Sequence, residues 1–106
     1  VFGMVIMVGL GGVFVEVLRD VVFRKAPVTP TQAADMLRGL QGVAMLYGVR
    51  GAPPVDMDAL TELIAAVSRF GAAAAQQVAE LDLNPVLAGP DGAVAVDWLL
   101  IQDTDH

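Results

Sequence analysis

The hydrophobic pattern of this chain changes period twice, and that change limits the fold more than any other feature. Short runs of β-branched and apolar residues, which are typical of strands, lie at 4–8, 13–17, 21–24, 79–87 and 93–99. Helical signals fill the middle, from about residue 29 to residue 77. Strands and helices are therefore grouped rather than alternating. This predicts the α+β class, with a mixed, mainly antiparallel sheet and helices packed on one face. The first three strands are joined too closely for parallel crossovers, so antiparallel neighbours are expected.

The two predicted helices begin at recognisable caps. Thr29 precedes a proline and stands three residues before Gln32, which is the spacing of a capping box, so a short helix should run to about Arg38. Residues 42–47 suggest a single helical turn, and 48–54 are rich in glycine and proline, as in a loop.

Asp56 begins the longer helix, which should end near Gln77 unless Gly71 shortens it. Apolar residues recur on one side of this helix at helical spacing. We expect this stripe to be core rather than a partner surface, and it comprises Met57, Leu60, Leu63, Ile64, Val67 and Phe70.

The apolar share is high for a single domain of 106 residues, with 56% hydrophobic and 17% charged residues. The chain either enters a membrane or is a lobe of a larger protein with apolar surface to cover. Its most apolar stretch, 1–15, contains four glycines and is shorter than the ~20 residues that span a bilayer. A secretory signal requires basic residues at its start, but no basic residue precedes Arg19. We therefore predict no membrane role, one domain over 1–106 cut from a larger protein, and self-association into a homo-oligomer through exposed apolar surface.

The charged residues exclude several function classes. Twelve acidic and six basic residues give a net charge of −6, which disfavours nucleic-acid binding. The absence of cysteine excludes disulfides, zinc thiolate sites and thiol nucleophiles, and it fits a cytoplasmic protein. The single histidine, His106, is the last residue, where a frayed end is expected.

A polar strand face lies near the end of the chain, where three residues alternate with leucine: Glu80, Asp82 and Asn84. The sequence Gly-Pro-Asp-Gly at 89–92 predicts a tight turn. If Ala88 faces Ala93 across it, the numbers of paired residues sum to 181, and Asn84 lies opposite Asp97 with Cβ atoms about 5 Å apart. Oxygen ligands gathered in this way suit Mg²⁺, which takes one or two carboxylates and leaves positions for phosphate oxygens. From spacing alone, a solvated strand face with an Asn-Pro bend is the favoured interpretation and a metal site the alternative.

Three blocks of the sequence carry a family resemblance. Asp82-Leu83-Asn84-Pro85, followed by Asp97, resembles the Asn-Pro hairpin of the ATP-grasp superfamily. Residues 9–24 with Ala26-Pro27, and residues 46–51, resemble further blocks of the ADP-forming acyl-CoA (acetyl-CoA) synthetases, which are related to the succinyl-CoA synthetase β-subunit. The resemblance covers nearly the whole chain and makes the metal site the favoured interpretation.

The resemblance implies an ATP-grasp C-terminal lobe that binds ATP and Mg²⁺. In that family, a ligase makes acyl-CoA, ADP and phosphate from a carboxylic acid, CoA and ATP through a phosphohistidine. Carried over to this chain, Asn84 and Asp97 bind Mg²⁺, and Asp82 binds or supports it. Glu16 and Arg24 are weaker candidates for facing the nucleotide cleft, and for each of them a plain ion pair or a solvated strand edge is an equally open alternative.

The resemblance also implies absent partners: an N-terminal ATP-grasp lobe, a CoA-binding domain and the transferring histidine, a role that His106 does not match. The isolated chain should therefore be inactive, while CoA and a carboxylic acid bind the full protein. Two alternatives stay open. One is a non-catalytic interaction or regulatory domain that retains the ATP-grasp scaffold, and the other is an unrelated α+β module with an incidental acidic hairpin.

Overall fold

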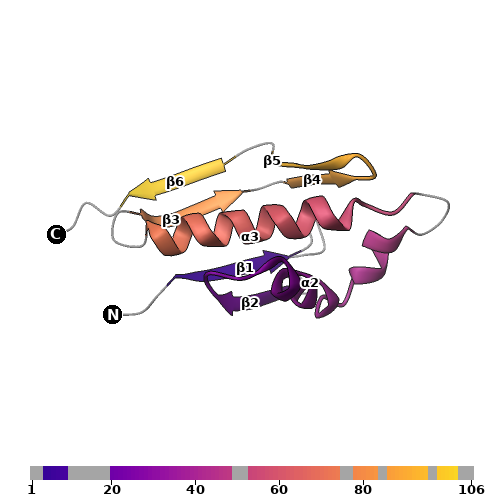
Figure 1. Cartoon of the computed structure of the whole chain (residues 1–106), viewed down its shortest axis with the longest axis horizontal. Coiled ribbons are helices and arrows are strands. Elements are labelled where there is room, and N and C mark those ends of the chain that lie inside the picture. The colour runs from indigo at the N-terminus through magenta and orange to yellow at the C-terminus, as the bar shows by residue number, and fades with distance from the viewer. Residues whose placement is uncertain are drawn as a thin grey trace.

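The computed structural model describes residues 4–9, 20–48, 53–74, 78–83, 86–95 and 98–102. Along the chain, these residues form β1 (Val5–Gly9), β2 (Val21–Lys25), α2 (Pro30–Arg38), η1 (Val43–Tyr47), α3 (Met57–Ala73), β3 (Val78–Leu83), β4 (Val86–Gly89), β5 (Gly92–Ala95) and β6 (Trp98–Gln102). The strands pair as β1–β2, β3–β6 and β4–β5, and each pair is antiparallel. The grouped strands and helices confirm the predicted α+β class. Figure 1 shows α3 running lengthwise between the β1–β2 pair and the C-terminal strands.

The β1–β2 pair has one face on the core and one in solvent. Its register sets Met7 opposite Phe23 and Val8 opposite Val22. Side chains alternate between the faces of a strand. The face with Ile6, Val8 and Val22 packs on the core, whereas the other face exposes Val5, Met7 and Phe23 by 56%, 60% and 55%. β1 and β2, which are the first and third of the predicted strands, pair antiparallel with each other. The strand predicted at 13–17 lies outside the described residues.

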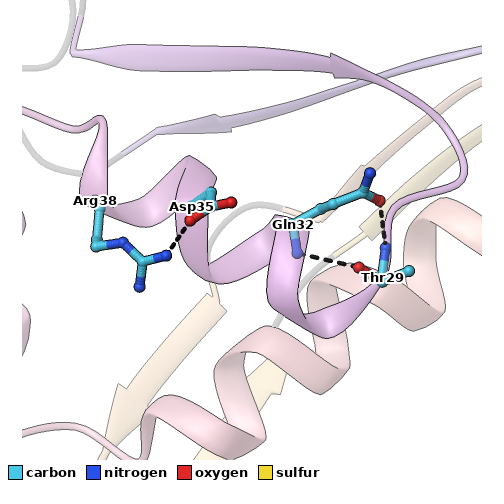
Figure 2. A network of polar contacts seen from close by, with 4 residues as sticks. All are labelled: Thr29, Gln32, Asp35 and Arg38. Atoms are coloured by element: carbon cyan, nitrogen blue, oxygen red, sulfur yellow. Dashed lines mark hydrogen bonds and ion pairs between the residues drawn. The ribbon is translucent and has the colours of Figure 1, made fainter.

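The predicted capping box fixes the start of α2 (Figure 2). The Thr29 hydroxyl accepts from the Gln32 backbone N–H at 3.1 Å, and the Gln32 side-chain oxygen accepts from the Thr29 N–H at 2.9 Å. One turn later, Arg38 forms an ion pair with Asp35. The capping box satisfies backbone donors that a helix N-terminus leaves unpaired, and α2 has the predicted bounds. The turn expected at 42–47 is the 3₁₀-helix η1.

Helix α3 begins as predicted but ends earlier. The Asp56 carboxylate caps it by accepting from the Ala59 N–H at 3.0 Å. The last helical residue is Ala73 rather than Gln77, and the Ala74 N–H bonds to the Phe70 carbonyl at 2.9 Å. Residues 75–77 lie outside the described part of the chain. In that part, no helix is long and apolar enough to cross a membrane.

The buried line of α3 is rotated from the apolar stripe that its sequence predicts. Ile64 is buried, and Met57 and Leu60 pack against the core as expected, but Phe70 is 47% exposed. The buried positions are instead mostly small or hydroxylated: Thr61, Ile64, Ala65, Ser68 and Gly71. Small side chains let neighbouring backbones approach closely, and α3 packs against α2. The core therefore lies among α2, η1 and α3, with its buried apolar residues at Val28, Ala33, Met36, Leu37, Leu40, Leu46 and Ile64.

Candidate functional site

The C-terminal hairpin consists of β3 and β6 at its base and β4 and β5 at its tip. Its described residue pairs keep one register from Glu80–Ile101 to Gly89–Gly92. At the base, Asp82 pairs with Leu99 and Leu83 with Trp98. Towards the tip, Val86 pairs with Ala95, and the ladder closes at Gly89 and Gly92. In each of these pairs the two residue numbers sum to 181, as the turn sequence predicts. A bulge between Val78 and Glu80 shifts the register only at the foot of β3.

The turn at the tip has a backbone conformation that favours glycine at position 92. Gly92 has φ +145°, a backbone conformation that glycine adopts far more readily than other residues. Pro90 and Asp91 form the exposed turn between the two strands. The hairpin is therefore closed by local chemistry, and this fixes which residues of β4 and β5 face each other.

The predicted site residues fall in different parts of the chain. Asn84, Asp97 and Glu16 lie outside the described residues. Asp82 lies in β3, which ends at Leu83, the residue before Asn84. Among the residues that the structure describes, no three acidic, histidine or cysteine side chains form a metal-binding group.

Arg24 lies in β2, opposite Ile6. Its side chain is exposed, and its Nη1 donates to the carbonyl of the neighbouring Phe23 at 2.9 Å. In the β1–β2 register, Arg24 shares the face of Ile6, whereas Met7 and Phe23 occupy the other face. Arg24 is therefore at the end of the core-facing side of this pair, with its guanidinium in solvent.

Two polar anchors were not predicted from the sequence. The Asp20 carboxylate joins the start of β2 to the turn after α2: Oδ1 accepts from the Gln41 N–H at 2.7 Å, and Oδ2 accepts from the Gly42 N–H at 2.9 Å. The Asp56 N–H donates to the Gly89 carbonyl at 2.7 Å, which joins the start of α3 to the hairpin tip. Each bond links residues that are distant in sequence, so no local pattern indicates it.

A separate open hollow of about 420 Å³ lies where α2, η1 and α3 meet. Its lining includes Thr31, Arg38, Tyr47 and Asp58. Among the predicted site residues, Arg24 alone has a described side chain, and it does not line this hollow.

Comparison with known proteins connects this fold to one family. A family model described as an ATP-grasp domain matches residues 1–101. The chain is 43% identical over 100 residues to subunit beta of ADP-forming acetate–CoA ligase I from Pyrococcus furiosus, covering 94% of this chain and 43% of that subunit. It is 45% identical over 91 residues to the ADP-forming 4-hydroxybutyrate–CoA ligase of Nitrosopumilus maritimus, covering 86% of this chain and 13% of that protein.

A solved structure shows the same fold. It is the dinucleotide-forming acetyl-coenzyme A synthetase 1 of Ca. Korarchaeum cryptofilum in complex with coenzyme A and Mg-AMPPCP, and it matches with a TM-score of 0.89 at 42% identity. The match covers 96% of this chain and 47% of that one, so this chain spans less than half the length of these relatives. With a family match over almost its entire length, the chain belongs to the ATP-grasp family.

Proposed function

We propose that this chain is the C-terminal ATP-grasp lobe of an ADP-forming acyl-CoA synthetase and supplies the ligands for the magnesium ion of the nucleotide. The full reaction would convert a carboxylic acid, CoA and ATP into acyl-CoA, ADP and phosphate through a phosphohistidine. The relatives named as acetate–CoA and 4-hydroxybutyrate–CoA ligases support the reaction class, and their different acids leave the acyl substrate of this chain open.

The observation that carries the proposal is the hairpin register. Pairs summing to 181 stand on both sides of residues 84 and 97, at Leu83–Trp98 and at Val86–Ala95. We propose that the same register continues between these pairs, in which case Asn84 lies opposite Asp97. Asp82, two residues before Asn84, would then lie on the same strand face.

The residues at these positions fit a magnesium site. An amide oxygen and one or two carboxylates are the protein ligands that Mg²⁺ commonly takes when phosphates and waters fill its other positions. In this proposal, Asn84 and Asp97 hold the ion, while Asp82 binds it or orients one of its waters. The ion would supply charge neutralisation at the phosphate oxygens, which is the main requirement of phosphoryl transfer. The related synthetase solved with Mg-AMPPCP supports ATP and Mg²⁺ as ligands.

Glu16 and Arg24 are proposed as additional nucleotide-facing residues. The exposed guanidinium of Arg24 supports this role, since a solvent-facing cation at the end of a strand is available to phosphate oxygens. Arg24→Ala in the full-length protein should then raise the KM for ATP. An unchanged KM would remove Arg24 from the site.

The partners proposed for this lobe are the N-terminal ATP-grasp lobe and a CoA-binding domain. The exposed β1–β2 face with Val5, Met7 and Phe23 supports a covering partner, because contiguous apolar side chains on a sheet face favour burial. We assign this face to the N-terminal lobe, because the match covers 43% of the Pyrococcus subunit and the rest of such a subunit would supply a lobe to cover it. Phe23→Glu should then weaken the association of separately expressed lobes without unfolding this one. Equal association of the variant would refute the assignment.

The magnesium assignment is tested in the full-length protein with Asn84→Ala and Asp97→Asn. The measurements are acyl-CoA synthesis and calorimetric binding of magnesium-ATP over a range of Mg²⁺ concentrations. Each variant should raise the required Mg²⁺ concentration at least about 10- to 100-fold, the range seen when metal sites lose supporting groups. Asp91→Asn is the matched control, because it removes a carboxylate from the exposed turn of the same hairpin.

Unchanged magnesium-ATP binding in both ligand variants would refute the metal assignment. If the full-length protein also made no acyl-CoA, the non-catalytic scaffold would be the function instead.

A further inference from the structure

The tip of the C-terminal hairpin is hydrogen-bonded to Asp56, the N-cap residue of α3. The backbone N–H of Asp56 donates to the Gly89 carbonyl at 2.7 Å, and the Asp56 carboxylate accepts from the Ala59 N–H at 3.0 Å. The preceding residue is also held, since the Val55 N–H donates to the Leu46 carbonyl at 2.9 Å. Asp56 thus stands at a junction where α3 begins, η1 is joined, and the hairpin tip is bound.

The tip needs such an anchor. β4 and β5 pair only with each other among the described strands, and their ladder has four residue pairs. An isolated two-stranded ribbon is marginally stable in water. Helix α3 packs against β5, and the bond from Asp56 to Gly89 fixes where along the helix that contact is made.

The hairpin is therefore held on both sides of the proposed magnesium ligands. The β3–β6 pair fixes the base below residues 84 and 97, and the Asp56–Gly89 bond fixes the tip beyond them. Without the Asp56–Gly89 bond, the β4–β5 ladder loses the contact that fixes its position along α3. Mg²⁺ demands near-octahedral geometry with ligands at about 2.0–2.1 Å, so small displacements weaken its binding.

We propose that Asp56 is a positioning residue for the magnesium site, acting through its backbone N–H on the hairpin tip. This inference rests on the proposed function, because it assigns the ligands to Asn84 and Asp97. The short loop before α3 would then support the nucleotide site, although the proposed ligands belong to the C-terminal hairpin.

The test compares Asp56→Pro with Asp56→Ala in the full-length protein. Asp56 has φ −74°, which a proline ring adopts without strain. Both variants lose the carboxylate cap, and the proline alone also loses the N–H that binds Gly89. The proline ring also displaces the Gly89 carbonyl and restricts Val55, so the difference between the variants measures the release of the tip from Asp56.

The measurements are the Mg²⁺ concentration for half-maximal acyl-CoA synthesis, the maximal rate at saturating Mg²⁺, and the melting temperature. We expect Asp56→Pro to require about tenfold more Mg²⁺ than Asp56→Ala, on the scale of other losses of support around metal ligands. Excess Mg²⁺ should restore the rate, which a purely structural defect would not allow. Equal Mg²⁺ requirements in the two variants would overturn the inference.

Gly92→Ala tests the same idea if the proline variant does not fold. Gly92 has φ +145°, so an added Cβ strains the tip, although no atom lies within 4 Å of it. Gly89→Ala is the matched control, because its Cβ also meets nothing within 4 Å and its φ is outside the range that favours glycine. Gly92→Ala should raise the Mg²⁺ requirement above that of Gly89→Ala, and equal values would count against the inference.

Asn84→Ala separates the two proposals. If it leaves the Mg²⁺ requirement unchanged, the proposed metal site itself is wrong. If it raises the requirement while Asp56→Pro matches Asp56→Ala, the metal site stands and only the positioning role fails.

Discussion

Replacement of Ser68 by alanine tests how the loop before α2 is held on α3. Ser68 is 2% exposed, and its hydroxyl accepts from the Val28 N–H at 2.8 Å. The same hydroxyl has two carbonyls within reach for its single proton: Ala65 at 2.8 Å and Val28 at 3.3 Å. Alanine keeps the helix but removes the acceptor, so the Val28 N–H would be buried without a partner.

The expected cost follows from the groups left unpaired. A buried donor that loses its partner costs about 1–3 kcal/mol. Alanine recovers about 0.5 kcal/mol of this because it favours a helix more than serine does. The net loss should be about 0.5–2.5 kcal/mol, which corresponds to a fall in melting temperature of roughly 2–20 °C for a domain of this size.

Urea unfolding followed by circular dichroism measures this loss. The midpoint should fall while the slope with urea concentration stays constant, since the same surface is exposed on unfolding. Thr61→Val is the matched control. The Thr61 hydroxyl is also buried on α3, but it donates only to the Asp58 carbonyl of the same helix at 3.1 Å. Such a bond adds little to helix stability, so the control should lose less than about 0.5 kcal/mol. A midpoint for Ser68→Ala equal to that of Thr61→Val would refute the reasoning.

Three further substitutions test the local anchors by the same unfolding measurement. Thr29→Ala should cost about 1 kcal/mol, the usual effect of losing an N-cap, and no loss would mean that the capping box adds nothing. Asp20→Ala should cost about 1.5–3 kcal/mol because two N–H groups lose a charged acceptor, and Asp20→Asn, which keeps one carbonyl acceptor, should cost less; the reverse order would contradict this account. Gly9→Ala should destabilise the chain, since its Cβ would lie 2.8 Å from Val21 Cγ1, whereas Gly89→Ala meets nothing within 4 Å; equal stabilities would show that β1 shifts to make room.

Local chemistry determined the elements whose signals lie within a few residues. The Thr29–Gln32 capping box predicted the start of α2, and the helix has the predicted bounds. The Gly-Pro-Asp-Gly turn predicted the hairpin register, which holds for the described pairs from Glu80–Ile101 to Gly89–Gly92. A turn or a cap is decided by bonds among neighbouring residues, so these predictions did not require the tertiary structure.

Packing decided the features that join distant parts of the chain. The apolar stripe of α3 predicted a buried Phe70, but close packing selected Ser68 and Thr61 for the interior, because Ser68 satisfies the Val28 backbone there. The pairing of β1 with β2, the first and third predicted strands, was likewise not indicated by any local pattern.

The sequence by itself determined the α+β class, the caps, the hairpin register and the family resemblance that favours Asn84 and Asp97 as magnesium ligands. Only the tertiary structure decided that Asp20 holds the turn after α2 and that Asp56 holds the hairpin tip. The physical reason is that a hydrogen bond between distant residues leaves no periodic mark in the sequence. Its partners come together only when the core has fixed the elements that carry them.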